Sequence, residues 1–132
     1  MRIFLDTNVL ASALTTRGLC AELFEVVLQS HDLLISEAVF RELQRILPEK
    51  LGQTEAITNG FIALLRAEGQ VITAEHSLPE LPDPDDEAIL AAALAGNAHV
   101  FVTGDKALLN LESVEGLPII TPRGLWESLA NE

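Results

Sequence analysis

The sequence predicts an α/β fold, a three-layer α/β/α sandwich around a mostly parallel sheet of about five strands. Two observations carry this prediction. Short apolar runs of strand length alternate with longer segments in which apolar residues recur at helical spacing, and no internal repeat or low-complexity segment interrupts the alternation. The 132 residues, 48% of them hydrophobic, suffice to bury about two-thirds of the unfolded surface around one core. We therefore expect residues 1–132 to form one domain.

The first part of the chain alternates between strand and helix. Residues 2–6 form an apolar run that predicts a buried strand, and residues 19–29 place apolar side chains at helical spacing. Residues 32–35 predict a second short strand. Ser36 is a good N-cap for a helix that runs to about Leu47.

The middle of the chain contains stronger stop signals. Pro48 marks the predicted end of the preceding helix, because proline lacks the N–H that a helix interior needs. Residues 56–67 predict another helix, which ends before Gly69, and residues 71–73 predict a third strand. The stretch SLPELPDPDD then carries three prolines within six residues and predicts an irregular loop.

The last part of the chain resumes the alternation. Asp85 or Asp86 can cap a helix that stops at Gly96, since acidic residues favour helix starts and glycine favours helix ends. Four further elements are predicted: a strand at 100–103, a helical turn at 106–109, a strand at 118–120 and a closing helix at 123–130.

The net charge of -12 argues against a basic groove that holds nucleic acid by phosphate neutralisation alone. A polyanion would need divalent metal, a basic partner or clustering of the eight Lys and Arg residues; an acidic surface also simply keeps a protein soluble. No apolar stretch approaches the roughly 18 residues of a membrane span, and no signal peptide is evident. The single cysteine, Cys20, suits a reducing compartment. We expect a soluble, cytoplasmic protein.

Two acidic residues follow predicted strands directly. Asp6 ends the first strand in FLDTNVL, and Asp105 follows the fourth in VTGDKALL. In open α/β sheets, ligands collect outside the carboxyl ends of the strands. If these two strands are neighbours, Asp6 and Asp105 face the same crevice.

Two further acids belong to predicted helices. Glu42 flanks the apolar face of its helix and can reach inward. Asp86 lies in the first turn of its helix, where the helix dipole alone would favour a negative charge. Asp83, Asp85 and Glu87 are its neighbours and remain open as contributors; Asp86 shares the inward stripe with Ile89, Glu87 is rotated away, and Asp83, between two prolines, is expected in the loop.

Convergence of these carboxylates would favour a divalent cation. Two carboxylates about 4 Å apart repel by roughly 4 kcal/mol at an effective dielectric near 20, and a cation removes that conflict. The histidines His31, His76 and His99 have no mutual metal spacing. Oxygen ligands alone favour Mg²⁺ or Mn²⁺ over Zn²⁺, and such ions support phosphodiester hydrolysis.

Five segments of the chain resemble the PIN domain family, in its branch of VapC-like toxin nucleases. In order along the chain they are IFLDTNVL, ISEAVFREL, DPDDEAILAAAL, VFVTGDKALL and LPIITPRGLWESL. No single segment is specific for the family, but the occurrence of all of them in this order over nearly the whole chain is a specific signal. The resemblance implies that Asp6, Glu42, Asp86 and Asp105 are the catalytic, metal-binding acids.

The resemblance also implies supporting roles. Thr103 would support the site through its hydroxyl, and Gly104 would allow a close turn of the backbone. Asn8 either orients a water or hydrogen-bonds the turn. Lys106, beside the expected crevice, is interpreted as a solvated charge.

Several other functions are disfavoured by the sequence. A haloacid dehalogenase-type phosphatase would have a second Asp where Asn8 stands, and a receiver domain would have adjacent acids near its start. Neither glycine-rich nucleotide-binding motif occurs. The rival hypothesis is a PIN-fold module with negligible catalysis that binds RNA or a protein, which the net charge mildly favours.

The resemblance predicts a metal-dependent endoribonuclease, the toxin of a toxin–antitoxin pair. Its RNA would meet the metals and a few cations, among them Arg17, Arg41, Arg45 and Lys106. A cognate antitoxin with a basic segment would insert into the acidic crevice. A homodimer is also expected, with the apolar helix faces around residues 51–65 as the candidate interface or, equally, as part of the core.

Overall fold

The computed structural model describes residues 1–73 and 83–132, in which the chain forms six strands and seven helices. The strands are β1 (Arg2–Leu5), β2 (Asp32–Ser36), β3 (Gln70–Ile72), β4 (Val100–Val102), β5 (Ser113–Val114) and β6 (Leu117–Ile120). The helices are α1 (Thr7–Thr15), α2 (Leu19–Ser30), α3 (Glu37–Glu49), α4 (Glu55–Glu68), α5 (Pro84–Ala95), α6 (Lys106–Leu109) and α7 (Pro122–Ala130).

The strands form one sheet in the order β3-β2-β1-β4-β6-β5. All pairings are parallel except that of β5 with β6. The chain moves outward from β1 through β2 to β3 and then returns to the other side of β1 as β4. The crevice between the ends of β1 and β4 is therefore a topological switch point, the usual place for a ligand in such sheets.

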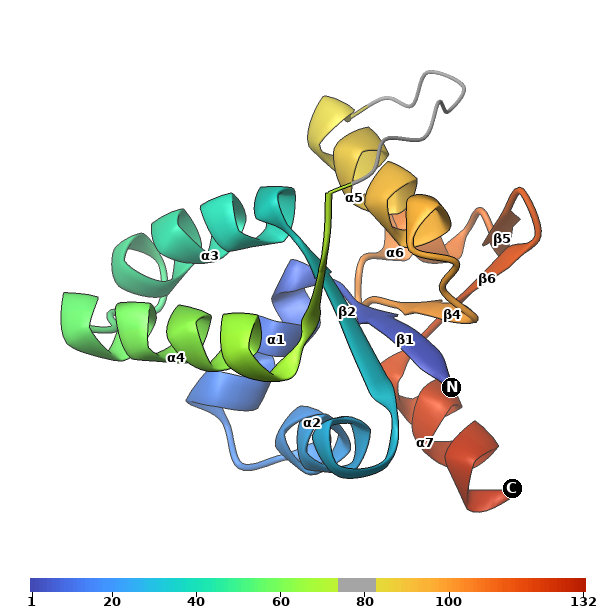
Figure 1. The fold of residues 1–132 in the computed structure, drawn as a ribbon, viewed down its shortest axis with the longest axis horizontal. Coiled ribbons are helices and arrows are strands. Elements are labelled where there is room, and N and C mark those ends of the chain that lie inside the picture. Colours follow the sequence, from blue (N-terminus) through green and yellow to red (C-terminus); the bar gives the residue numbers. More distant parts are fainter. Residues whose placement is uncertain (74–82) are drawn as a thin grey trace.

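Helices cover both faces of the sheet, which confirms the predicted α/β fold with a mostly parallel sheet. Figure 1 shows α5 on one side of the central strands and α2 and α7 on the other. The helices α3 and α4 lie side by side, to the left of the strands in Figure 1. None of the helices in the described ranges has the length and apolar character needed to cross a bilayer.

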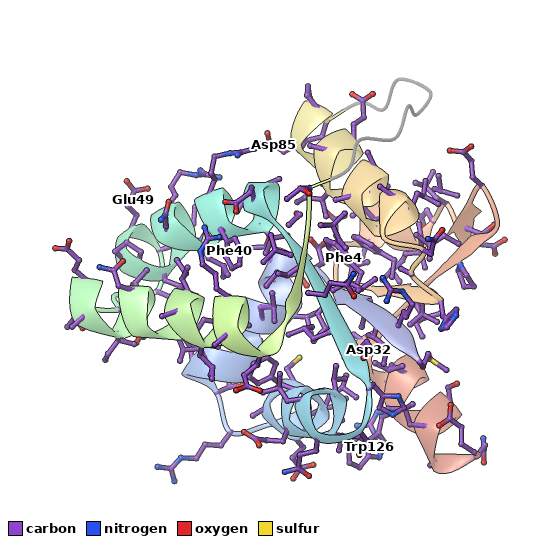
Figure 2. The ribbon with its side chains drawn as sticks, viewed as in Figure 1. Phe4, Asp32, Phe40, Glu49, Asp85 and Trp126 are labelled. Carbon is purple, nitrogen blue, oxygen red and sulfur yellow. The ribbon has the colours of Figure 1, made fainter. Side chains whose placement is uncertain are left out.

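The two central strands carry the middle of the core. Phe4 of β1 and Phe101 of β4 are register partners, are fully buried, and stack with ring centroids 5.4 Å apart. Burying a side chain of this size contributes about 1.5–3 kcal/mol relative to leaving it exposed. Figure 2 shows Phe4 in the interior and Glu49 and Asp85 at the periphery. This packing holds β1 and β4 together immediately below the switch point.

Two elements lie where the sequence predicted none. The helix α1 begins directly after β1, with Asp6 as its N-cap, so Asp6 belongs to the helix start and the strand ends at Leu5. Its sequence, TNVLASALT, begins with three residues of low helix propensity, and the Leu and Ala residues that favour a helix follow only from Leu10 on. The two-residue strand β5 brings the sheet to six strands, one more than the approximate prediction.

Two predicted boundaries are wrong. The helix α3 continues past Pro48 to Glu49, because the buried Leu47 holds the last turn in place and only one backbone hydrogen bond is lost there. The cap of α5 is Asp83 instead of Asp85 or Asp86, since Pro84 suits the first helical position. The remainder of the predicted proline-rich loop, and His76, lie outside the described residues.

The predicted ambiguity over residues 51–65 resolves into two faces. Phe61, Ile62 and Leu65 of α4 are buried in the core. In contrast, Ile57 and Leu64 of α4 and Leu51 before it are exposed by 47%, 41% and 41%.

Candidate active site

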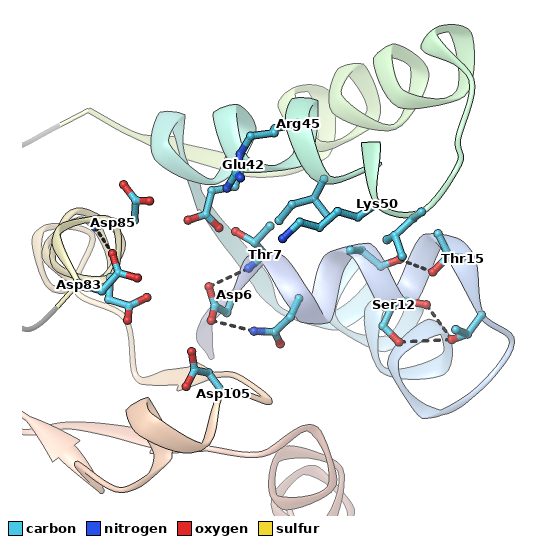
Figure 3. Close-up of a pocket in the computed structure, with 16 residues that line it drawn as sticks. Asp6, Thr7, Ser12, Thr15, Glu42, Arg45, Lys50, Asp83, Asp85 and Asp105 are labelled. Atoms are coloured by element: carbon cyan, nitrogen blue, oxygen red, sulfur yellow. Dashed lines mark hydrogen bonds between the residues drawn. The ribbon is translucent and has the colours of Figure 1, made fainter. Parts of the chain in front are cut away.

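A cavity of about 680 Å³ opens at the carboxyl ends of β1 and β4, between α1, α3 and α5. Six acidic residues line it: Asp6, Glu42, Asp83, Asp85, Asp86 and Asp105. Figure 3 shows Asp6 and Asp105 close together and Glu42 projecting toward them from α3, whereas Asp85 lies farther out at the start of α5. The four acids predicted from sequence therefore line one cavity, although they come from four separate segments.

Asp6 is held by three hydrogen bonds. Its Oδ1 accepts from the Thr7 backbone N–H at 2.8 Å, and its Oδ2 accepts from the Thr103 hydroxyl at 2.7 Å and from Asn8 Nδ2 at 3.1 Å. Asp6 is only 5% exposed. Burial raises the pKa of Asp6; the bonds from Thr103 and Thr7 oppose the rise, and the charge of Asp105 adds to it.

Thr103 links the two strand ends. Its hydroxyl is fully buried, donates to Asp6, and accepts from the Asp105 N–H at 3.0 Å and from Asn8 Nδ2 at 3.2 Å. The register that pairs Leu5 with Val102 brings it to Asp6, whose own N–H donates to the Val102 carbonyl at 2.9 Å. Strand pairing thus sets the spacing of the two acids.

Asn8 and Gly104 close the same network. Asn8 Oδ1 accepts from the Gly104 N–H at 3.0 Å while its amide group donates to Asp6 and Thr103. The sequence left two roles open for Asn8, orienting a water or hydrogen-bonding the turn. The contacts of Asn8 are those of a residue that hydrogen-bonds the turn. A Cβ at Gly104 would lie 3.4 Å from Asn8 Oδ1, which is ordinary contact, so the N–H is the part of Gly104 that the network uses.

Asp105 is the N-cap of α6. Its Oδ1 accepts from the N–H groups of Ala107 at 2.8 Å and Leu108 at 3.4 Å. No hydrogen bond from the described part of the chain engages Oδ2. One carboxylate oxygen of Asp105 therefore fixes the side chain while the other stays available.

Glu42 projects from α3 beside Thr7. Burial raises the pKa of Glu42, the Thr7 hydroxyl lowers it through a weak contact, and the charges of Asp6 and Asp85 raise it further, with Arg45 opposing. The Thr7 hydroxyl is buried, and no group in residues 1–73 or 83–132 gives it a hydrogen bond of ordinary geometry. In the described part of the chain, Thr7 Oγ1 is therefore a buried polar atom without a hydrogen-bond partner, on a residue that lines the cavity.

Asp86 lies in the first turn of α5, as predicted. Burial raises the pKa of Asp86 to about 6, with further contributions from the charges of Asp83, Asp105, Asp6 and Glu42. Five carboxylates thus share one electrostatic environment. This mutual repulsion is what a bound cation would relieve.

The donor set fits a hard divalent cation. Among the described residues that line the cavity, the oxygen donors are carboxylates, hydroxyls and the Asn8 amide, and there is no imidazole or thiolate. Within the described ranges, no three ligating side chains lie close enough to hold one ion together. Mg²⁺ commonly uses one or two carboxylates and completes its shell with water and substrate phosphate, so the arrangement suits that ion without a closed protein cage.

The sequence model of the PIN domain matches residues 2–107 of the chain. The chain belongs to the PIN domain family. A search of curated proteins found no significant match.

Solved structures show the same fold at low sequence identity. The chain is similar to one in the crystal structure of VapBC2 from Rickettsia felis bound to a DNA fragment from their promoter, with 16% identity, a TM-score of 0.66, and coverage of 92% of this chain and 98% of that one. It is also similar to VapBC-1 from nontypeable Haemophilus influenzae, with 19% identity, a TM-score of 0.60, and coverage of 93% and 99%. A third similar structure is that of the PIN domain endonuclease Utp24, with 20% identity, a TM-score of 0.52, and coverage of 91% of this chain and 84% of that one.

Several residues that line the cavity of this PIN domain were not singled out from its sequence. Among them are Thr7, which directly follows the first acid, and Lys50, which is the C-cap of α3 and lies eight residues after Glu42. Since the sequence predicted that this helix stops before Pro48, it gave no signal that Lys50 reaches the cavity. Of the cations expected to meet RNA, Arg45 lines the cavity, whereas Arg17, Arg41 and Lys106 are not among its lining residues.

Proposed function

We propose that this PIN domain is a metal-dependent endoribonuclease, the toxin of a toxin–antitoxin pair. The observation that supports the proposal is the single cavity in which Asp6, Glu42, Asp86 and Asp105 gather at the switch point of the sheet. The likeness to VapBC structures and to Utp24 supports the same assignment. Mg²⁺ or Mn²⁺ is the cofactor, and the cytoplasm is the expected compartment.

In this proposal, Asp6 and Asp105 are the ligands with a fixed position. Thr103, Asn8 and the helix-start N–H groups hold their carboxylates before any substrate arrives. Glu42 and Asp86 approach from α3 and α5 and complete the set. When bound, a divalent ion supplies Lewis acidity toward a phosphoryl oxygen and makes water a better nucleophile.

Glu42 and Asp86 also have a second role in this proposal, in proton transfer. Glu42 and Asp86 both have a raised pKa, so each carboxyl can take up or release a proton closer to neutral pH than an ordinary carboxyl can. Such groups suit proton transfer to and from the attacking water and the leaving 3′ oxygen. Asp6, held by three hydrogen bonds, suits positioning instead.

Calorimetric titration of Mn²⁺ tests the metal site. Saturable binding is expected in the wild type and should be lost in Asp6→Asn and in Asp105→Asn. Asp32→Asn is a matched control, because Asp32 is an exposed acid at the start of β2, the opposite end of a parallel strand. Binding that survives both site substitutions, or is absent in the wild type, would contradict the proposed site.

The rival hypothesis, a PIN-fold module that binds RNA or protein without catalysis, makes a different prediction. If the protein is a nuclease, expression should arrest growth, and Asp6→Asn should abolish the arrest. If it acts by binding alone, the arrest should persist in Asp6→Asn, because that substitution leaves the surface of the molecule almost unchanged.

The proposed antitoxin is a small protein with a basic segment. Six acids and two cations line the cavity, so a positively charged side chain would be attracted into it. A short arginine-containing peptide should therefore inhibit RNA cleavage, and a peptide of the same length with glutamate in place of arginine should not. Equal inhibition by both would contradict insertion of a basic segment.

A homodimer through α4 is the last part of the proposal. Ile57 and Leu64 are seven residues apart, share one face of α4 and are exposed, as is Leu51. Sedimentation should show a dimer that the double substitution Ile57→Asp and Leu64→Asp dissociates. Leu111→Asp changes another exposed leucine as a control. A wild type that remains monomeric at micromolar concentration would refute the dimer.

A further inference from the structure

The charge of the cavity wall changes sign along α3. Glu42 and Arg45 lie on this helix, Lys50 is its C-cap, and all three line the cavity. At a rise of about 1.5 Å per residue, Arg45 lies about 4.5 Å and Lys50 about 12 Å along the helix axis from Glu42. Figure 3 shows Arg45 beside Glu42 and the Lys50 side chain extending along the cavity toward Thr7.

Facing these cations, the last turn of α1 and its C-cap contribute hydroxyl groups whose protons are already used. Thr15 donates to the Ala11 carbonyl at 2.9 Å, and Thr16 donates to the Ser12 carbonyl at 2.7 Å. The Ser12 hydroxyl lies 3.4 Å from Thr16 Oγ1, which leaves Ser12 as the donor of that pair. These hydroxyls can therefore accept hydrogen bonds from a ligand but have no free proton for a phosphate.

Arg45 and Lys50 are consequently the strong donors on this side of the cavity. Both are exposed, and among residues 1–73 and 83–132 the one ion pair within 4 Å is that of Arg66 with Glu37. Arg2 is occupied elsewhere, because its guanidinium donates to the Gly96 carbonyl. Although six carboxylates line the same cavity, neither of its cations forms an ion pair with any residue that the structure describes.

We propose that Arg45 and Lys50 form a phosphate-binding subsite that holds the backbone of single-stranded RNA beside the acidic centre. The inference rests on the proposed nuclease function and extends it by locating where the substrate lies. With a net charge of -12, the protein repels a polyanion over most of its surface. Two cations in line with Glu42 let neighbouring phosphates enter along α3 while the scissile phosphate reaches the acids.

Each cation also has a local role from which the subsite must be distinguished. Lys50 is the C-cap of α3, where a positive charge stabilises the helix dipole. Arg45 lowers the pKa of Glu42 by its charge. Both local roles affect the protein alone, so neither changes the number of phosphates that RNA binding neutralises. The salt dependence of binding measures that number.

The test is RNA binding measured by fluorescence anisotropy over a series of KCl concentrations at constant Mg²⁺. The parent protein is Asp6→Asn, which should not cleave the labelled single-stranded RNA. Two double variants are made in this parent. The first combines Arg45→Gln with Lys50→Gln, and the charge-matched control combines Arg41→Gln with Arg123→Gln. The control residues are exposed and do not line the cavity.

Loss of two phosphate contacts should flatten the plot of log K against log [KCl] by about 1.4, at roughly 0.7 for each phosphate on a single strand. The control pair should leave the slope unchanged. Equal slopes in all three proteins, equal flattening in both pairs, or no RNA binding by the parent would overturn the subsite. If the wild type cleaves no RNA with Mg²⁺ or Mn²⁺ while the slope difference persists, the nuclease function fails and the subsite stands.

Discussion

The strand-end acids and the helix acids of the cavity are held very differently. Asp6 and Asp105 follow β1 and β4, and backbone and side-chain donors fix both carboxylates. Glu42 and Asp86 project from α3 and α5, and in the described part of the chain neither accepts a hydrogen bond of ordinary geometry. The sheet positions Asp6 and Asp105, whereas the positions of Glu42 and Asp86 depend only on how α3 and α5 pack.

This difference assigns distinct physical properties to the two pairs. A carboxylate held by several donors keeps its place at little entropic cost when a ligand binds. A carboxylate without such donors keeps the full cost of burial and of repulsion, which is why the pKa of Asp86 rises to about 6. The strand-end pair should therefore control binding, and the helix pair should limit stability.

The largest expected effect is on cleavage. Asp6→Asn should lower the rate by about 10³-fold, because a fixed ligand supports several kcal/mol of transition-state stabilisation. Asp32→Asn should leave the rate unchanged. A gel assay of labelled RNA with Mn²⁺ measures both. Retention of the rate in Asp6→Asn would remove the distinction between the pairs.

A smaller effect, on stability and on metal affinity, is expected when the hydrogen bonds that hold Asp6 and Asp105 are removed. Thr103→Val removes the donor of the buried hydrogen bond to Asp6 and the acceptor of the half-buried hydrogen bond from the Asp105 N–H. It should lower the free energy of unfolding by about 2–3 kcal/mol and weaken Mn²⁺ binding about 10- to 100-fold.

Thr58→Val is the matched control for that prediction. Thr58 is also buried, but its hydroxyl has no hydrogen-bond partner in the described residues. The same substitution there should leave stability equal or slightly higher in urea unfolding. Equal losses at both positions would show that the network around Thr103 adds nothing to ordinary packing.

The smallest predicted effect concerns the helix pair and has the opposite sign. The folded protein holds a proton on Asp86 more tightly than the unfolded chain does, so the stability of the metal-free protein falls as pH rises from about 4 to about 6. Asp86→Asn removes this cost and should stabilise the protein by about 1 kcal/mol at neutral pH after solvent screening. Below pH 4 it should have little effect.

Glu87→Gln serves as the control for Asp86→Asn. Glu87 lies in the same first turn of α5 but does not line the cavity, so its substitution loses only a favourable interaction with the helix dipole. Thermal unfolding in EDTA at pH 4 and pH 7.5 compares the two. Destabilisation by Asp86→Asn at neutral pH would mean that the acids do not repel one another as described.

Local signals in the sequence were sufficient to predict most of the elements and to single out four acids that line one cavity. Ser36 and Gly96 cap helices where the sequence predicts, because their preferences depend on the adjacent backbone alone. The same local logic failed at α1, whose first three residues, Thr7, Asn8 and Val9, have low helix propensity, and at Pro48, where burial of Leu47 outweighs the local stop signal.

The sequence by itself thus determined which segments are strands and helices and which residues carry the carboxylates. Only the tertiary structure decided how they meet. The register of Leu5 with Val102 brings Thr103 to Asp6, and the packing of α3 against α1 brings Lys50 into the cavity. Both follow from pairing between segments far apart in the chain, and such pairing depends on the packing of the whole core, which no local stretch of sequence specifies.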